Sequence, residues 1–289
     1  MKIRAIILSA LILCGISAVI MYSRAAQPLQ KSSVITQAIN DKNTPMVIKN
    51  LILKMKEQME VNDDQFPELI KEVENYTNSC ADSASVAVLH SMLAEMYQNY
   101  YQRNQWTINQ RTQLSGYIPE DIRVWTSNLF TDKIKEEIDL SLRPTALLQN
   151  TPVSKFKDIL EIGKDSQTLR PTLYEFLAFR ALDIQPTVQI YKDLIAFQNK
   201  EPNMKSVLLT ELDYLRFLYG DKRDKESFEA YMNALDELYR NLASQNYAAE
   251  ILIAKLDLVS GSMFRYVSTQ WDSIKAEEVK LCEEGIKRY

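Results

Sequence analysis

Histidine, cysteine and glycine are scarce in this chain of 289 residues, and the first two shortages limit its chemistry. A Ser-His-Asp or Cys-His catalytic arrangement needs a histidine oriented by a carboxylate, so only His90 could serve. His90 lies in a strongly helical stretch, and we interpret it as a packed histidine with satisfied hydrogen bonds. Zinc sites usually take several histidine or cysteine ligands. One histidine and the two distant cysteines that follow the N-terminal apolar run do not provide them.

Motifs for nucleotides and calcium are also missing. The sequence contains neither G-x-G-x-x-G nor G-x-x-x-x-G-K-[ST]. The adjacent acids Asp63 and Asp64 lack the spacing of a calcium loop. We place the carboxylates of Glu136, Glu137 and Asp139 on a solvated helix face rather than in a glycosidase pair. We therefore expect no catalytic, cofactor-binding or metal-binding residues, and no enzyme activity.

The charge is close to balanced, with a formal net charge of −4, 25% charged residues and 46% hydrophobic residues. There is no basic excess of the kind that binds nucleic acid, and no acidic tail. After the first residues, no apolar run is long enough to span a bilayer. We expect a globular protein whose partners are proteins rather than nucleic acid.

The N-terminus differs from the rest of the chain. Lys2 and Arg4 precede an apolar run over residues 5–21, and small residues follow, with Ser23 and Ala25 as the expected cleavage positions. This pattern is typical of a secretory signal peptide over residues 1–25, which predicts export to the periplasm or cell envelope. An uncleaved membrane anchor and an acylated Cys14 remain as alternatives, and the anchor would be the only contact with a membrane.

Cleavage would leave two cysteines, Cys80 and Cys282, at opposite ends of the mature chain. A long exported domain does not depend on a disulfide as a small one does. We expect two buried free thiols, with a disulfide between them as the alternative.

Helical periodicity dominates after the signal, and alternating strand patterns are hard to find. The sequence predicts an all-α fold, an irregular α-solenoid of stacked helical hairpins. We expect an N-terminal helical part over residues 26–186. A tetratricopeptide-like part over residues 187–289 continues it. Single helices are expected over residues 82–105 and 122–142, and a short one from a cap at Thr151.

The stretch LRPTLYEFLAFRALDIQP, residues 169–186, predicts a helix with Pro171 at its first position and Pro186 beyond its end. Apolar residues form two stripes around it, one with Phe176 and Leu177 and the other with Phe179. A helix that is apolar on two faces is normally buried between neighbours, so we expect an inner helix of the array. Tyrosines at helical spacing recur through the chain, and we expect them to pack between helices rather than line a peptide groove.

Several fragments resemble the N-terminal helical region of large exported bacterial alpha-2-macroglobulin-like proteins. They are LHSMLAEMYQNYY, QWTINQRT, GYIPEDIRVWTSNLF, LRPTLYEFLAFRALD and CEEGIKRY, from about Val86 to the end. In that family this region precedes the macroglobulin β-sandwich domains. The resemblance implies a link to endopeptidase inhibition by trapping proteases in the periplasm or at the cell surface.

The chain departs from that family in its inhibitory parts, since it has no run of β-sandwich strands, no bait region and no thioester motif. The thioester joins a cysteine to a glutamine three residues on, and the residue three after Cys282 is Gly285. No functional residue of the family therefore transfers to this sequence.

We expect a non-enzymatic helical scaffold segment, a truncated copy or a fragment of such an inhibitor. It would orient downstream macroglobulin domains or dock a protease or an envelope protein. The first alternative is a stand-alone cell-envelope adaptor that binds a protein or peptide. The second is a nutrient-binding lipoprotein. An enzyme comes last, because it would need a cleft with several carboxylates of raised pKa.

Overall fold

The computed structural model describes residues 43–61, 65–112, 116–160, 163, 165–200, 203–220, 224–262 and 271–289. Helices account for most of these residues, and they contain no strand, only an isolated antiparallel bridge between Pro152 and Thr172. The predicted all-α class is confirmed. None of the helices in this part of the chain combines the length and hydropathy that a bilayer span requires. The expected signal peptide at 1–25, Cys14, Asp63 and Asp64 lie outside the described residues.

The α-helices follow one another with short connections. Their bounds are α2 Thr44–Val61, α3 Phe66–Ser79, α4 Ser83–Ile108, α5 Ser127–Ser141, α6 Thr145–Asn150, α7 Ser166–Leu169, α8 Leu173–Ile184, α9 Val188–Gln198, α10 Met204–Tyr219, α11 Lys225–Leu242, α12 Ala249–Ser262 and α13 Trp271–Arg288. The described connections include the 3₁₀ turns η3 Ile122–Val124, η4 Val153–Phe156 and η5 Asn246–Ala248.

The chain divides into two compact units, residues 1–73 and 74–289. In the first unit, α2 and the start of α3 each bury a stripe of apolar side chains. The buried residues are Val47, Ile48, Leu51, Met55, Phe66, Leu69, Ile70 and Val73. Lys54 of α2 forms an ion pair with Glu72 of α3. The expected division at residue 186 stays a prediction.

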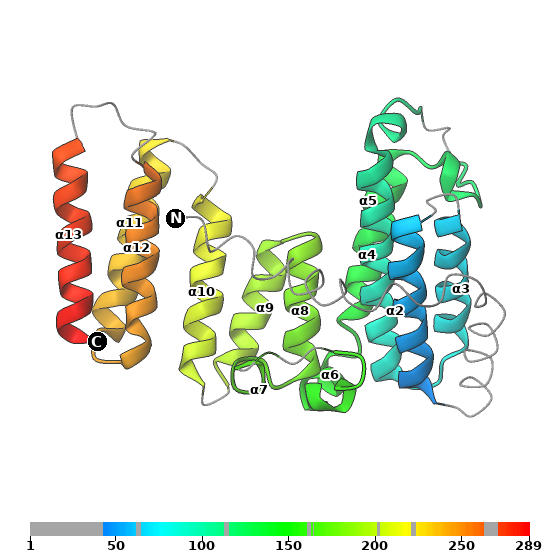
Figure 1. Ribbon diagram of the computed structural model, residues 1–289, viewed down its shortest axis with the longest axis horizontal. Coiled ribbons are helices and arrows are strands. Elements are labelled where there is room, and N and C mark those ends of the chain that lie inside the picture. The colour runs from blue at the N-terminus through cyan, green and yellow to red at the C-terminus, as the bar shows by residue number, and fades with distance from the viewer. Residues whose placement is uncertain are drawn as a thin grey trace, which may run out of the picture. The chain divides into compact units, whose positions relative to one another are not determined.

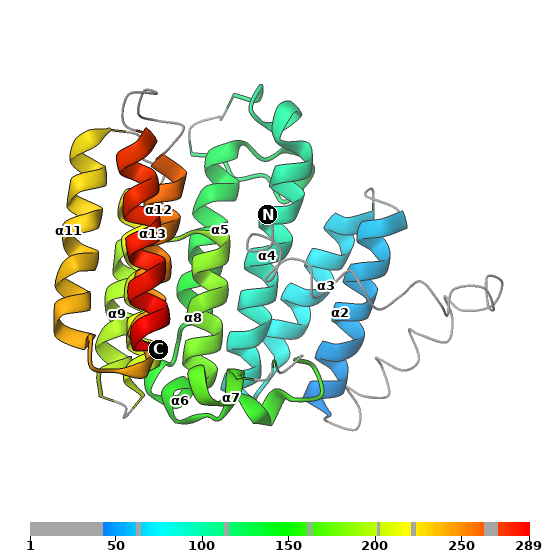
Figure 2. The same ribbon diagram turned by 60° about the vertical axis from the view of Figure 1, so that its left-hand side comes forward.

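The second unit is a row of antiparallel helices. Its most extensive contact joins α4 and α5, and α4 also packs on α8. From α8 to α13 each helix packs on the next. Figure 1 shows α8, α9 and α10 side by side in sequence order, and Figure 2 shows α12 and α13 beside α11. Such packing buries the apolar face that each helix cannot cover alone. The finer assignment to a tetratricopeptide-like solenoid stays a prediction.

An aromatic cluster divides the single helix expected over residues 122–142. Trp125 is extended, and its ring stacks on Tyr97 of α4 with centroids 5.7 Å apart. Its indole N–H donates to the carbonyl of Pro119 at 2.7 Å, and its own carbonyl accepts from Arg111 at 2.7 Å. These contacts hold Trp125 in an extended conformation against the helical propensity of the segment. The expected helix is therefore divided into η3 and α5, which begins at Ser127. The preceding helix, expected to end at residue 105, continues to Ile108.

Two other boundaries differ from the expectation for a related reason. The segment after Thr151 forms the 3₁₀ turn η4 instead of a short α-helix, because its backbone pairs with the chain before α8. Val153 N–H donates to the Pro171 carbonyl at 2.9 Å, and Leu173 N–H donates to the Thr151 carbonyl at 2.8 Å. Pro171 is therefore held outside α8, and Thr172 is the N-cap. The expected end before Pro186 is confirmed.

The two cysteines are free, as expected, but they are not buried. Cys80 is half-buried and Cys282 is exposed on α13. The expectation of buried thiols was wrong because Cys80 follows the end of α3, outside the core, and Cys282 lies on an exposed face of α13.

Candidate functional site

His90 and Glu137 join α4 to α5. His90 Nδ1 lies 2.7 Å from Glu137 Oε2, and Lys133 Nζ lies 2.7 Å from the other carboxylate oxygen. Glu137 is only 2% exposed, so its expected place on a solvated face was wrong, whereas Glu136 and Asp139 are exposed as predicted. Burial raises the pKa of Glu137, but hydrogen bonds from His90 and Lys133 outweigh it and hold that pKa below its ordinary value. Both carboxylate oxygens of Glu137 therefore have partners, as buried polar groups usually do. We interpret this contact as one that fixes the packing of α4 on α5.

A groove of about 790 Å³ lies in the second unit, between α5 and α6 on one side and α8 and α9 on the other. Its wall includes four buried side chains, Ile138 of α5, Tyr174 of α8, and Ile190 and Phe197 of α9. Leu142, Ala196 and a set of polar and charged residues complete the lining. Its volume lies in the range of ligand sites, but most of its lining is polar or charged, which favours a peptide segment over an apolar small molecule.

Tyr174 is the most informative residue of the groove. It is 4% exposed, and its ring meets Phe197 edge-on, with centroids 5.2 Å apart. Burial raises the pKa of Tyr174 to about 12, with a further contribution from the charge of Asp193. The hydroxyl therefore keeps its proton at neutral pH, yet it has no hydrogen-bond partner among the described residues. A buried tyrosine usually finds one, so a donor is left available beside the groove.

Hydrogen bonds between α8, α9 and α10 hold this wall in place. Thr172 and Glu175 form a capping box at the start of α8. Glu175 Oε1 also accepts from Gln198 Nε2 at 3.1 Å, and Gln198 Oε1 accepts from the Thr210 hydroxyl at 2.7 Å. Tyr174 precedes Glu175 and Phe197 precedes Gln198 in the sequence. The three-residue chain Glu175–Gln198–Thr210, which we call the polar ladder, therefore positions both aromatic rings.

A second group of titratable residues lies on α8 and α10. Burial raises the pKa values of Asp183, Glu211 and Asp213, and the nearby Arg170 offsets this only in part for the two aspartates. The Arg170 guanidinium lies 3.5 Å from the ring centroid of Phe179. None of the three carboxylates lines the groove. Because Arg170 interacts with both aspartates, we interpret the group as a polar contact between α8 and α10.

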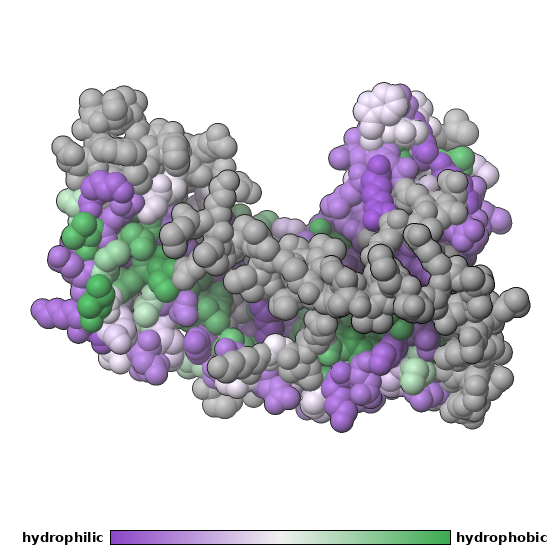
Figure 3. All heavy atoms as spheres, in the orientation of Figure 1, coloured by the Kyte–Doolittle hydropathy of each residue, from purple (hydrophilic) through white to green (hydrophobic). Residues whose placement is uncertain are grey.

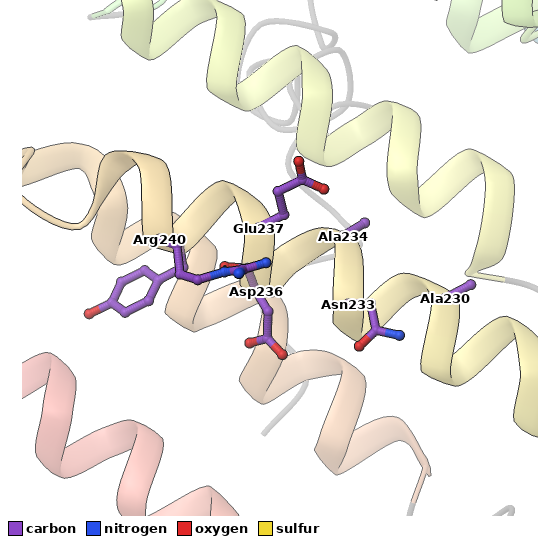
Figure 4. Close-up of a pocket in the computed structure, with 7 residues that line it drawn as sticks. Ala230, Asn233, Ala234, Asp236, Glu237 and Arg240 are labelled. Atoms are coloured by element: carbon purple, nitrogen blue, oxygen red, sulfur yellow. The ribbon is translucent and has the colours of Figure 1, made fainter.

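A shallow depression of about 640 Å³ runs along α11. Figure 4 shows that its labelled residues all come from that one helix, with Glu237 and Asp236 pointing to different sides. Asp236 is already paired with Lys255 of α12. Polar groups from separate elements do not converge here, so the depression is a feature of the helix surface rather than a site.

Large hydrophobic residues are exposed at the end of α4 and on the connection from α4 to α5. Trp106, at 79% exposed, is accompanied by Tyr117, Ile118 and Val124. Figure 3 shows pale and green residues among purple ones over this hairpin, and green residues also over α11 to α13. Exposed aromatic and aliphatic side chains in one segment are a common mark of protein contact.

The tyrosines expected to pack between helices mostly do so. Tyr97, Tyr100, Tyr174, Tyr191, Tyr231 and Tyr239 are buried, and Tyr101, Tyr214, Tyr219 and Tyr247 are half-buried. The prediction missed that one of them, Tyr174, also lines a groove. No signal in the sequence marked it, because the groove depends on the spacing of α5 and α9.

Comparison with protein-family models, with curated proteins and with solved structures gives no match. Among the described residues, no group of three or more histidine, cysteine, aspartate or glutamate side chains is arranged to hold a metal ion.

Proposed function

We propose that this protein is a non-enzymatic helical scaffold that binds an extended segment of a partner protein in the groove between α5 and α9. The buried Tyr174 hydroxyl, a donor with no partner among the described residues, carries this proposal. A peptide backbone supplies the acceptor that this donor needs, and the wall of Ile138, Ile190 and Phe197 accommodates an apolar side chain.

The signal-like segment at 1–25 supports a role in the periplasm or cell envelope. The exposed residues between α4 and α5 support contact with a second protein surface. A role as the N-terminal scaffold of a macroglobulin-like inhibitor, which the sequence resemblance implies, stays a prediction. In that role, the groove would hold a segment of the downstream domains or of a protease.

The test is a selection of phage-displayed random dodecapeptides on the immobilised protein. Ala196 is exposed and lines the groove, so Ala196→Trp places an indole in it. Ala276→Trp makes the same change on exposed α13 and is the matched control. We expect selected peptides to bind the wild type and the control equally, and the groove variant about ten-fold more weakly. Peptides that bind all three equally, or a failure to select any, would reject the groove as the binding site.

Tyr174→Phe gives an independent check, because it removes only the hydroxyl. If the hydroxyl donates to the bound segment, the affinity falls by the net value of one hydrogen bond, about 0.5–1.5 kcal/mol. Thermal stability should stay the same or increase, because a buried donor without a protein partner is lost. A loss of stability with unchanged affinity would mean that the hydroxyl serves the fold.

A further inference from the structure

Some of the charged side chains that line the groove have partners among the described residues, and others do not. Lys135 Nζ lies 3.6 Å from Asp139 Oδ2, and Asp193 Oδ1 accepts from Gln189 Nε2 at 2.8 Å. The two other cations of the lining, Arg143 and Lys200, form no side-chain hydrogen bond or ion pair with any described residue. Both are exposed and free to meet a ligand.

Arg143 and Lys200 follow the C-terminal ends of α5 and α9. Positive charge there complements the helix dipoles, which contributes to stability without any ligand. The helix dipoles do not explain why both cations line the same groove, because the two residues follow helices that are distant in sequence. Together with the Tyr174 hydroxyl, these two side chains are hydrogen-bond donors for which the described residues supply no acceptor.

We propose that the segment bound in this groove is acidic, with an aspartate or glutamate side chain directed at Arg143 and Lys200 and an apolar side chain against Ile190 and Phe197. This rests on the proposed function. Arginine and lysine only donate hydrogen bonds, and a carboxylate only accepts them, so the two sets are complementary. The lining holds three cations, Lys135, Arg143 and Lys200, against two anions, Asp139 and Asp193, so it carries one positive charge in excess.

The dodecapeptide selection tests this when it is repeated with depletion on the Ala196→Trp variant, so that only groove-dependent peptides survive. Display fixes the C-terminus of each peptide to the phage coat, so any enriched carboxylate belongs to a side chain. Selected peptides are then synthesised with an amidated C-terminus, and their binding is measured by fluorescence anisotropy at two salt concentrations.

The deciding comparison uses two double variants of equal net charge. Arg143→Gln/Lys200→Gln removes the groove cations, and Lys157→Gln/Lys192→Gln removes two exposed cations outside it. We expect aspartate and glutamate to be enriched, and the first variant to bind about three- to ten-fold more weakly, with a smaller salt dependence. The control should differ from the wild type by less than about two-fold.

The remaining outcomes distinguish a failure of the acidic class from a failure of the groove function. Groove-dependent peptides without acidic enrichment, or equal losses in the two double variants, would overturn the acidic class and leave the groove function intact. Survival of no groove-dependent peptide would reject the function itself, and the acidic class with it. Circular dichroism of each variant shows that a loss of binding does not come from unfolding.

Discussion

At the scale of single residues, Glu137 differs most from its expected role. Glu136 precedes it, and Lys135 and Asp139 lie two residues away on either side, so the local pattern indicates solvent. Its burial follows from the position of His90, 47 residues earlier. Such a pair cannot be recognised from one sequence, because the spacing between two packed helices decides it.

The Glu137 pair predicts a dependence of stability on pH. The pKa of this carboxyl is lowered in the folded protein, so protonation favours the unfolded chain. Its contribution should be complete above the ordinary pKa of 4.5 and should be lost as the pH falls through the lower folded value. Urea titrations from pH 7 to pH 3 measure this.

Glu137→Gln should lower the free energy of unfolding at pH 7 by about 1.5–3 kcal/mol and flatten the acid dependence, because hydrogen bonds to a charged group are lost. Glu136→Gln, on the exposed side of the same helix, is the control and should change stability by less than about 0.5 kcal/mol. Equal effects of the two substitutions would contradict the pair.

At the scale of elements, helix existence was predictable and helix boundaries were less so. The stop before Pro186 and the cap at Asp82 depend on local chemistry that the sequence carries directly. The stacking of Trp125 on Tyr97 and the backbone pairing of η4 involve partners 18 to 28 residues away in the sequence. The groove belongs to this second group, because four helices supply its lining.

Helix α8 allows a test of which stripe forms the core. Leu177 is fully buried, whereas Phe176, assigned to the same stripe by sequence, is half-buried. Leu177→Ala should lower the free energy of unfolding by about 2–5 kcal/mol. Phe176→Ala should lower it by less than the about 3–5 kcal/mol that a fully buried ring would give. Denaturant titration of both variants checks this, and a larger loss for Phe176→Ala would contradict the packing of α8.

At the scale of the whole molecule, the chain consists of two compact units, and only the coarse class was predictable. Few glycines and widespread helical periodicity indicate an all-α protein, whatever the packing. The unit boundary at residue 73 lies inside α3, a continuous helix, so no composition change marks it. Boundaries of this kind follow from contacts rather than from linker sequence.

The two units should respond separately to core substitutions. Leu51 belongs to the core of the first unit and Leu177 to that of the second. Leu51→Ala should increase amide hydrogen exchange in α2 and leave α9 and α10 unchanged, and Leu177→Ala should do the reverse. Mass spectrometry of peptic fragments measures both. Faster exchange throughout the chain in either variant would show one cooperative unit instead.

The polar ladder has a consequence for how the chain tolerates changes in length. An α-helix advances by about 100° per residue, so one residue added inside α9 before Gln198 would turn that side chain away from Glu175 and Thr210. Three helices would lose their common register, and Tyr174 and Phe197 would no longer share a wall. Residues added between Asn199 and Asn203 lie outside both helices and leave the ladder intact. During evolution, insertions and deletions should therefore accumulate in that turn and be excluded from the eleven residues of α9.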